Sequence, residues 1–287
     1  MRQCLLALLL LTAGPTQPPS EPIVRIGLNQ NAATVTIRSA RPFTVEQRTT
    51  RSATFASVLA VEPGTSGPLK KADLKYRITV ELDGDVVLAL APGSRVRIAP
   101  GGAPLEIDTR AYRGALDVFG NSRNRLTIVN ELPLEEYLRG VVPNELNPTA
   151  FGQLEALKAQ AVAARTYIQR NLGQHKHEGY DICATDACQV YFGVLTEDPL
   201  ATQAVVETRG VVATYDGRPI TAYYSSTCGG RTEDAEHIFG QKIPYLVSTS
   251  CVHKDPKPLP FASSRAIANW KEGVLAVARV STFAEAA

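Results

Sequence analysis

Between residues 23 and 129, short runs of alternating apolar and polar residues recur along the chain. An alternation with a period of two places successive side chains on opposite faces of a strand, so each run predicts a β-strand. Clusters of Gly, Pro and Asp separate the runs at spacings of about 8–12 residues, which is typical of antiparallel sandwiches and barrels. This part shows no catalytic constellation, and we interpret it as a scaffold or a binding module. The clearest runs are Ile23–Leu28, Thr34–Ile37, Tyr76–Val80, Val86–Leu90 and Arg125–Val129.

From Leu132 onward, apolar residues recur every three or four positions, which predicts helices. The longest helical pattern runs from roughly Thr149 to Asn171. It follows Asn147 and Pro148, which suit an N-cap and the first helical position. Its apolar stripe is expected to face a core and consists of Leu157, Ala161, Ala164 and Ile168.

A second helix is predicted from Leu200 to Thr208, and a hairpin follows it. The two hairpin strands are Val211–Tyr215 and Ile220–Tyr224, joined by a turn that contains Asp-Gly. The second strand leads directly into the polar, glycine-containing loop Ser225–Glu233. Loops of this kind commonly hold binding residues.

These patterns together predict an α+β fold, with a β-rich N-terminal part followed by a mixed core of helices and strands with one long helix. We expect a signal peptide and linker at residues 1–20 and the β-rich part at residues 21–125. The catalytic core is expected at residues 126–255, and residues 256–287 form a weakly patterned tail.

The N-terminus indicates export. Met1 and Arg2 precede the apolar run Cys4–Thr12, and small residues follow it, as in a cleaved signal peptide. The run is too short to span a bilayer, which takes about 20 apolar residues, and no later segment could cross one. The alternative is a retained anchor. We expect a location in the periplasm or cell envelope.

Composition adds little to this picture beyond arguing against a nucleic-acid-binding protein. The 287 residues are 44% hydrophobic and 20% charged, with a formal net charge of +2 and both signs interspersed. This composition is typical of a globular protein, and it gives no indication of a nucleic-acid partner.

Four blocks of the chain resemble the SpoIID/LytB family, which is named for the stage II sporulation protein D and an amidase enhancer. The second block is specific enough to support the resemblance alone. The resemblance implies a lytic transglycosylase that acts on peptidoglycan glycan strands, with Glu145 as the catalytic acid. A role in sporulation is inferred only from the family name. The blocks are Asn130–Glu145, Leu154–Tyr167, Asp181–Tyr191, and Tyr223–Glu233 with Pro244–Leu246.

One carboxyl group suffices for this reaction. It protonates the glycosidic oxygen while the 6-hydroxyl of the substrate's own muramic acid attacks, so the second carboxylate of a retaining hydrolase is not needed. Val141–Pro143 and Leu146 flank Glu145, and burial among them would raise its pKa and keep it protonated. Taken without the resemblance, Glu145 is a helix-start residue that interacts with the helix dipole or with Lys158.

Two further groups of residues are candidates for the same site. Lys158 and Arg165 are expected to line the groove beside Glu145. The alternative is a solvated helix face with a weak Glu155–Lys158 pair. Sugar binding by stacking and by hydroxyl hydrogen bonds is expected at Tyr191, Tyr224, Ser225, Ser226 and Thr227, although these residues would also suit a structural role.

Removal of the signal leaves four cysteines, which allow two disulfides or a metal site. The resemblance implies a zinc ion in some family members, and the matching ligands here are His177, Cys183 and Cys188. A local Cys183–Cys188 disulfide and free thiols are the alternatives. A second disulfide between Cys228 and Cys251 is our preferred pairing for the other two.

Two other functions compete with the transglycosylase. The first is a non-catalytic wall-binding protein that stimulates a separate cell-wall amidase, which would then be its partner. The second is a zinc-dependent hydrolase that uses the Cys/His loop.

Overall fold

The computed structural model describes residues 21–41, 43–49, 52–61, 76–81, 85–90, 94–225, 229–250 and 279–281. The expected signal peptide, most of the expected tail, and the predicted residues Ser226, Thr227, Cys228 and Cys251 lie outside these ranges.

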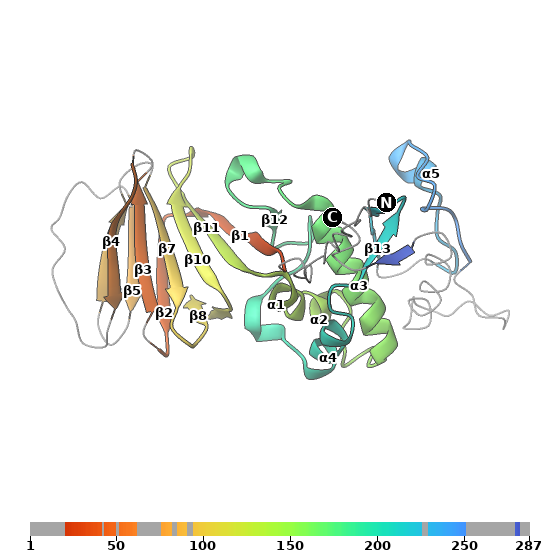
Figure 1. The fold of residues 1–287 in the computed structure, drawn as a ribbon, viewed down its shortest axis with the longest axis horizontal. Coiled ribbons are helices and arrows are strands. Elements are labelled where there is room, and N and C mark those ends of the chain that lie inside the picture. Colours follow the sequence, from red (N-terminus) through yellow and green to blue (C-terminus); the bar gives the residue numbers. More distant parts are fainter. Residues whose placement is uncertain are drawn as a thin grey trace, which may run out of the picture.

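Two sheets make up the N-terminal part (Figure 1). In each of the two sheets, one pair of neighbouring strands is parallel and the other pairs are antiparallel. The seven-stranded sheet has the order β12 (Ile182–Cys183), β1 (Ile23–Ala32), β11 (Leu126–Pro133), β10 (Ala115–Gly120), β7 (Ser94–Pro100), β3 (Phe43–Thr49) and β4 (Ser52–Val61). The five-stranded sheet has the order β6 (Asp85–Leu90), β5 (Tyr76–Glu81), β2 (Thr34–Ser39), β8 (Leu105–Ile107) and β9 (Arg110–Tyr112).

The alternating runs form strands because one face of each sheet is buried. In β2, Val35 and Ile37 are buried, and in β7 Val96 and Ile98 are buried. Side chains from both sheets belong to one apolar cluster, so the sheets pack against each other as a sandwich. The strand runs read from the sequence are therefore confirmed.

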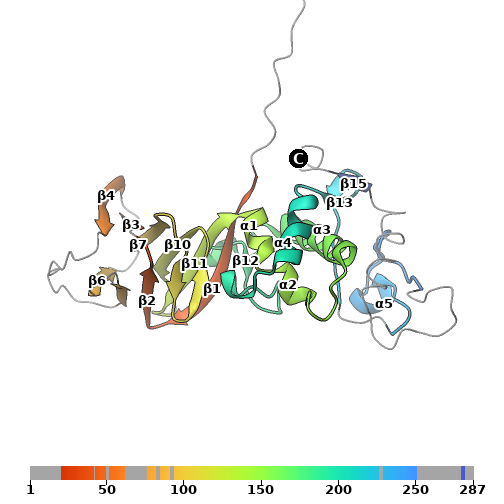
Figure 2. The ribbon, with the colours of Figure 1, turned by 90° about the horizontal axis from the view of Figure 1, so that it is seen from below.

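The remaining elements follow the sandwich along the long axis of the molecule, with α1 next to β1 and α5 at the far end (Figure 2). The helices are α1 (Leu134–Arg139), α2 (Val142–Glu145), α3 (Leu154–Asn171), α4 (Pro199–Glu207) and α5 (Ala235–Phe239), with single 3₁₀ turns η1 (Lys176–Glu178) and η2 (Gly193–Thr196). A small sheet has the order β14 (Arg218–Pro219), β13 (Val212–Tyr215) and β15 (Arg279–Ser281). Within the described ranges, no helix is both long and apolar enough to span a membrane. The mixture of sheets and helices is an α+β fold.

Two element boundaries differ from the prediction. Asn147 Oδ1 accepts hydrogen bonds from the backbone N–H of Thr149 and Ala150, but it caps a single turn, and α3 begins only at Leu154. The second hairpin strand is confined to Arg218–Pro219, because beyond Ile220 the chain leaves the β13 ladder.

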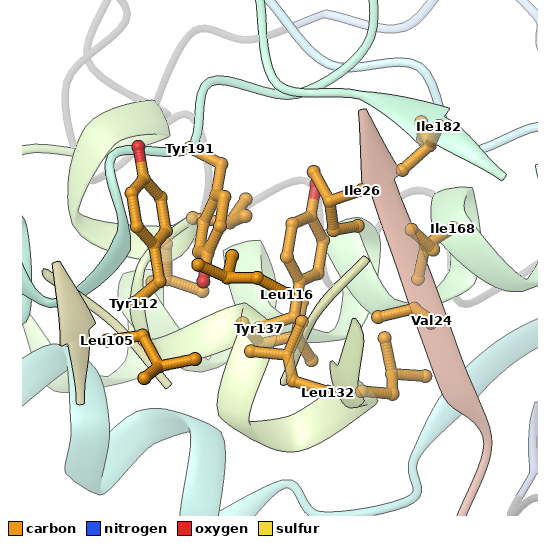
Figure 3. Close-up of a cluster of buried hydrophobic side chains, with 14 of the residues drawn as sticks. Val24, Ile26, Leu105, Tyr112, Leu116, Leu132, Tyr137, Ile168, Ile182 and Tyr191 are labelled. Carbon is orange, nitrogen blue, oxygen red and sulfur yellow. The ribbon is translucent and has the colours of Figure 1, made fainter. Parts of the chain in front are cut away.

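A single core connects the sandwich to the helices. Figure 3 shows Ile26 of β1 and Leu116 of β10 in the same cluster as Tyr137 of α1 and Ile168 of α3. The sheet also continues across the predicted boundary at residue 125, because β11 lies between β1 and β10. The sandwich thus supports the helices directly.

Candidate functional site

Glu145 is the last residue of α2, and this short helix is fixed from several sides. The Asn144 amide donates to Gly140 O at 2.6 Å, to Thr196 Oγ1 at 2.9 Å and to Val190 O at 3.4 Å. A Cβ on Gly140 would lie 2.7 Å from the carbonyl oxygen of Gly193, so the close approach of these segments requires glycine there. The backbone that precedes Glu145 is therefore held in one position.

The Glu145 carboxyl group is partly buried and accepts two hydrogen bonds. The backbone N–H of Val190 donates to its Oε1 at 2.8 Å, and the Tyr224 hydroxyl is its second partner. Burial raises the pKa of Glu145 above 4.5, and the bonds from Val190 and Tyr224 oppose the rise. The net effect keeps the carboxyl protonated at a higher pH than an exposed glutamate.

Gln189 connects Tyr224 to the core. Its side chain is fully buried and donates to Ala164 O at 3.1 Å and to the Tyr224 hydroxyl at 3.2 Å. Its Oε1 accepts from the Tyr137 hydroxyl at 3.2 Å. Burial raises the pKa of both tyrosines, so each stays a neutral donor. These hydrogen bonds thereby position the Tyr224 hydroxyl next to the Glu145 carboxyl group.

Tyr167 of α3 adds a further aromatic ring to the site. Its ring centroid lies 6.4 Å from that of Tyr224 in an edge-on arrangement. Its pKa is raised, first by burial and then by the ionisable groups of Tyr223 and Glu145 nearby. Tyr137, Tyr167 and Gln189 lie in the motif blocks, but no spacing in the sequence assigned them a role.

Arg165 does not line a groove, which corrects the prediction. Its side chain is 0% exposed and forms two 2.8 Å hydrogen bonds with the Glu135 carboxylate. It also donates to the carbonyl oxygens of Val211 and Val205. Helices α1 and α4 cover the flank of α3 that holds Arg165, so this cation is structural.

Lys158 lies at the contact between α3 and α4. Its ammonium group is 2.8 Å from the Glu155 carboxylate and 2.6 Å from that of Glu207. The pair with Glu155 is the one expected from spacing. Two carboxylates thus hold Lys158, and neither of them is Glu145.

The prediction that Tyr191 binds sugar is also corrected, because this side chain is 2% exposed and cannot stack on a sugar. Its hydroxyl donates to Asn130 Oδ1 at 2.9 Å, and its ring centroid is 4.9 Å from that of Tyr137. Of the described sugar-binding candidates, Tyr224 is a hydrogen-bonding partner of Glu145, and Ser225 is the exposed residue that follows it in the chain.

Cys183 and Cys188 form a disulfide, with an S–S distance of 1.97 Å. The histidine near these sulfurs is His175, whose Nε2 lies 3.8 Å from Cys188 Sγ, whereas the expected ligand His177 is exposed. A cysteine binds zinc as a thiolate, and the two sulfurs of a disulfide offer none. This arrangement does not fit the metal, and zinc stays a proposal for the reduced pair.

A separate polar cavity of about 310 Å³ lies on the outer face of the seven-stranded sheet. Its charged groups pair with one another at 2.7–3.0 Å, which is a structural ion-pair network. The residues that line it are Arg25, Arg95, Arg97, Asp117 and Glu131, and Glu145 is not among them.

Comparison with known proteins identifies a domain within the chain. Residues 122–215 match the SpoIID family, described as stage II sporulation protein. This span contains Glu145, Gln189 and Val190, and it ends before Tyr224.

Three relatives illustrate the extent of the likeness. An uncharacterised protein of Brachyspira hyodysenteriae is 41% identical over 136 residues, which are 47% of this chain and 36% of that protein. Stage II sporulation protein D of Bacillus subtilis is 42% identical over 135 residues, or 42% of this chain and 39% of the relative. The amidase enhancer of Bacillus subtilis is 42% identical over 120 residues, or 42% of this chain and 16% of the relative. The chain spans less than half the length of these relatives.

Proposed function

Because residues 122–215 match the SpoIID family, we propose that this protein remodels the bacterial cell wall as an exported lytic transglycosylase. Its substrate is the peptidoglycan glycan strand. Glu145 acts as the general acid and then as the general base. The observation that supports this most is a partly buried carboxyl of raised pKa, held by Val190 N–H and by a tyrosine hydroxyl.

The reaction uses Glu145 twice. The protonated carboxyl donates its proton to the glycosidic oxygen as the bond to the anomeric carbon breaks. The carboxylate then accepts the proton of the muramic-acid 6-hydroxyl as this oxygen bonds to the anomeric carbon, which yields a 1,6-anhydro sugar. Among the described residues, the hydrogen-bonding groups that shift the Glu145 pKa are a backbone N–H and a hydroxyl, and neither is the second carboxylate of a retaining hydrolase.

Substitution Glu145→Gln tests the assignment. It keeps the side-chain shape but removes the transferable proton, and general acid–base catalysis contributes about 10²–10⁴-fold to rate. We therefore expect release of anhydro-muramic products from denuded glycan strands to fall by about that factor, measured by chromatography and mass spectrometry.

Glu155→Gln is the matched control, because Glu155 is an exposed glutamate that pairs with Lys158. This variant should cleave as the wild type does. Equal activity of Glu145→Gln and wild type would refute the catalytic role.

A non-catalytic amidase enhancer is the second candidate, and the name of one relative favours it. Under this alternative the wild type binds glycan, releases no anhydro product and raises the rate of a separate cell-wall amidase. Loss of cleavage with a chelator, together with full activity of Glu145→Gln, would instead favour a zinc-dependent hydrolase.

A further inference from the structure

We propose that the stacked rings of Tyr223 and Phe239 form an aromatic platform, and that one sugar ring of the glycan strand near Glu145 stacks on the open face of one of these rings. The inference rests on the proposed function and specifies where the same site holds its substrate. Neither residue was among the sugar-binding candidates, and both lie beyond the matched span.

The two rings stack on each other but remain open to solvent. Their centroids are 4.8 Å apart with an interplanar angle of 29°, and Tyr223 is 46% and Phe239 48% exposed. Ile238 is 62% exposed beside them. Each residue of the stacked pair thus keeps about half of its surface in water, where an aromatic ring can pack against a ligand.

Tyr223 connects the platform to the candidate catalytic group. It directly precedes Tyr224, whose hydroxyl accepts a hydrogen bond from the Gln189 side-chain amide at 3.2 Å. The backbone N–H of the residue after Gln189 donates to Glu145 Oε1 at 2.8 Å. Phe239 ends α5, which lies at the end of the molecule away from the sandwich in both ribbon views (Figures 1 and 2).

The size of the platform favours a sugar over a protein. An aromatic side chain has roughly 150–250 Å² of surface, so each half-exposed residue of the stack offers about 100 Å² on its own side. A specific protein interface buries about 1,200 Å² or more, so a surface of this size suits one sugar ring better than a protein partner. The C–H groups on the face of a pyranose ring suit an aromatic π-face, and neither platform residue carries a charge.

The test measures glycan binding without turnover. In the Glu145→Gln background, Tyr223→Ala and Phe239→Ala should each weaken binding of denuded glycan strands about tenfold by calorimetry. Tyr223→Leu and Phe239→Leu keep apolar bulk without a flat ring and should weaken binding similarly. Tyr223→Phe, which keeps the ring, should bind as the background does.

Ile238→Ala is the matched control, because Ile238 is more exposed but has no flat ring. Binding that is unchanged in the Ala and Leu variants would overturn the platform, as would a loss confined to binding of an amidase. If wild type releases no anhydro product but the platform variants still lose glycan, the proposed reaction fails and the platform stands. If the background variant binds no glycan, both fail.

Discussion

At the residue scale, the pKa of Glu145 results from opposing effects. Burial disfavours the carboxylate and raises the pKa, while the bonds from Val190 and Tyr224 stabilise the carboxylate and lower it. Burial is the largest of the three effects. A general acid is active only when protonated, so cleavage should decline as pH rises through this pKa.

Tyr224→Phe tests that balance. The variant removes a bond that lowers the pKa of Glu145, so the descending limb of the pH–rate profile should move to higher pH. The measurement is kcat/KM for glycan cleavage across a pH series. A limb that stays in place or moves to lower pH would show that Tyr224 does not bond the carboxylate.

The same shift has a consequence for stability. A carboxyl with a raised folded-state pKa binds more protons in the native state, so its contribution to stability falls as pH rises above 4.5 through the folded pKa. Glu145→Gln lacks this dependence. The Tm of this variant relative to wild type should therefore rise across that window, which is an activity-independent check.

At the scale of elements, one loop determines the geometry around Glu145. The segment between η1 and η2 supplies the Val190 N–H and the Gln189 side chain, and the Cys183–Cys188 disulfide closes it just before those residues. The backbone N–H of Cys183 donates to Cys188 Sγ at 3.2 Å, and that of Tyr191 donates to Ala184 O at 3.3 Å. The hydrogen bond from the Val190 N–H to Glu145 therefore depends on the conformation of this loop.

Replacing both cysteines by serine should loosen this loop. Closing a loop this short restricts the unfolded chain by about 2 kcal/mol in the chain-entropy description, so Tm should fall accordingly. Cleavage of glycan should fall several-fold, because Val190 is less well placed. Dithiothreitol should reproduce both losses in wild type and should affect the double variant less, because only the predicted Cys228–Cys251 bridge remains there to be reduced. Full activity of the reduced wild type would contradict this account.

At the scale of the whole molecule, the buried Arg165–Glu135 pair joins three helices and the segment that precedes β13. Glu135 belongs to α1 and Arg165 to α3, and the guanidinium also bonds Val205 O of α4 and Val211 O before β13. Glu135 further accepts the N–H of Gly210 at 3.2 Å. These bonds fix the arrangement of the helices around α2 and Glu145.

Arg165→Met should destabilise the fold by about 3–5 kcal/mol in denaturant unfolding, because it leaves the Glu135 charge buried without its partner. Arg165→Met combined with Glu135→Leu should recover part of that loss. Lys158→Met, at an exposed ion pair on the same helix, is the control and should change unfolding little. A small effect of Arg165→Met would mean that Glu135 is not a buried carboxylate.

The sequence by itself determined the elements and the central carboxyl group. Period-two alternation predicted the strands of the sandwich, the three-to-four period predicted α3, and the resemblance of the motif around Glu145 to a known family implied the chemistry. These features depend on local patterns, which a chain displays whatever it packs against.

Only the tertiary structure decided which of the other candidates surround Glu145. Arg165 and Tyr191 match motif blocks as well as Tyr224 does, but packing buries the first two and brings only Tyr224 to the carboxyl. Likewise, the rings of Tyr223 and Phe239 are far apart in the sequence and meet only in the fold. Spacing shows which face of an element a side chain occupies. Whether that face meets solvent, a core or a carboxyl group depends on long-range contacts, which are set by the whole chain.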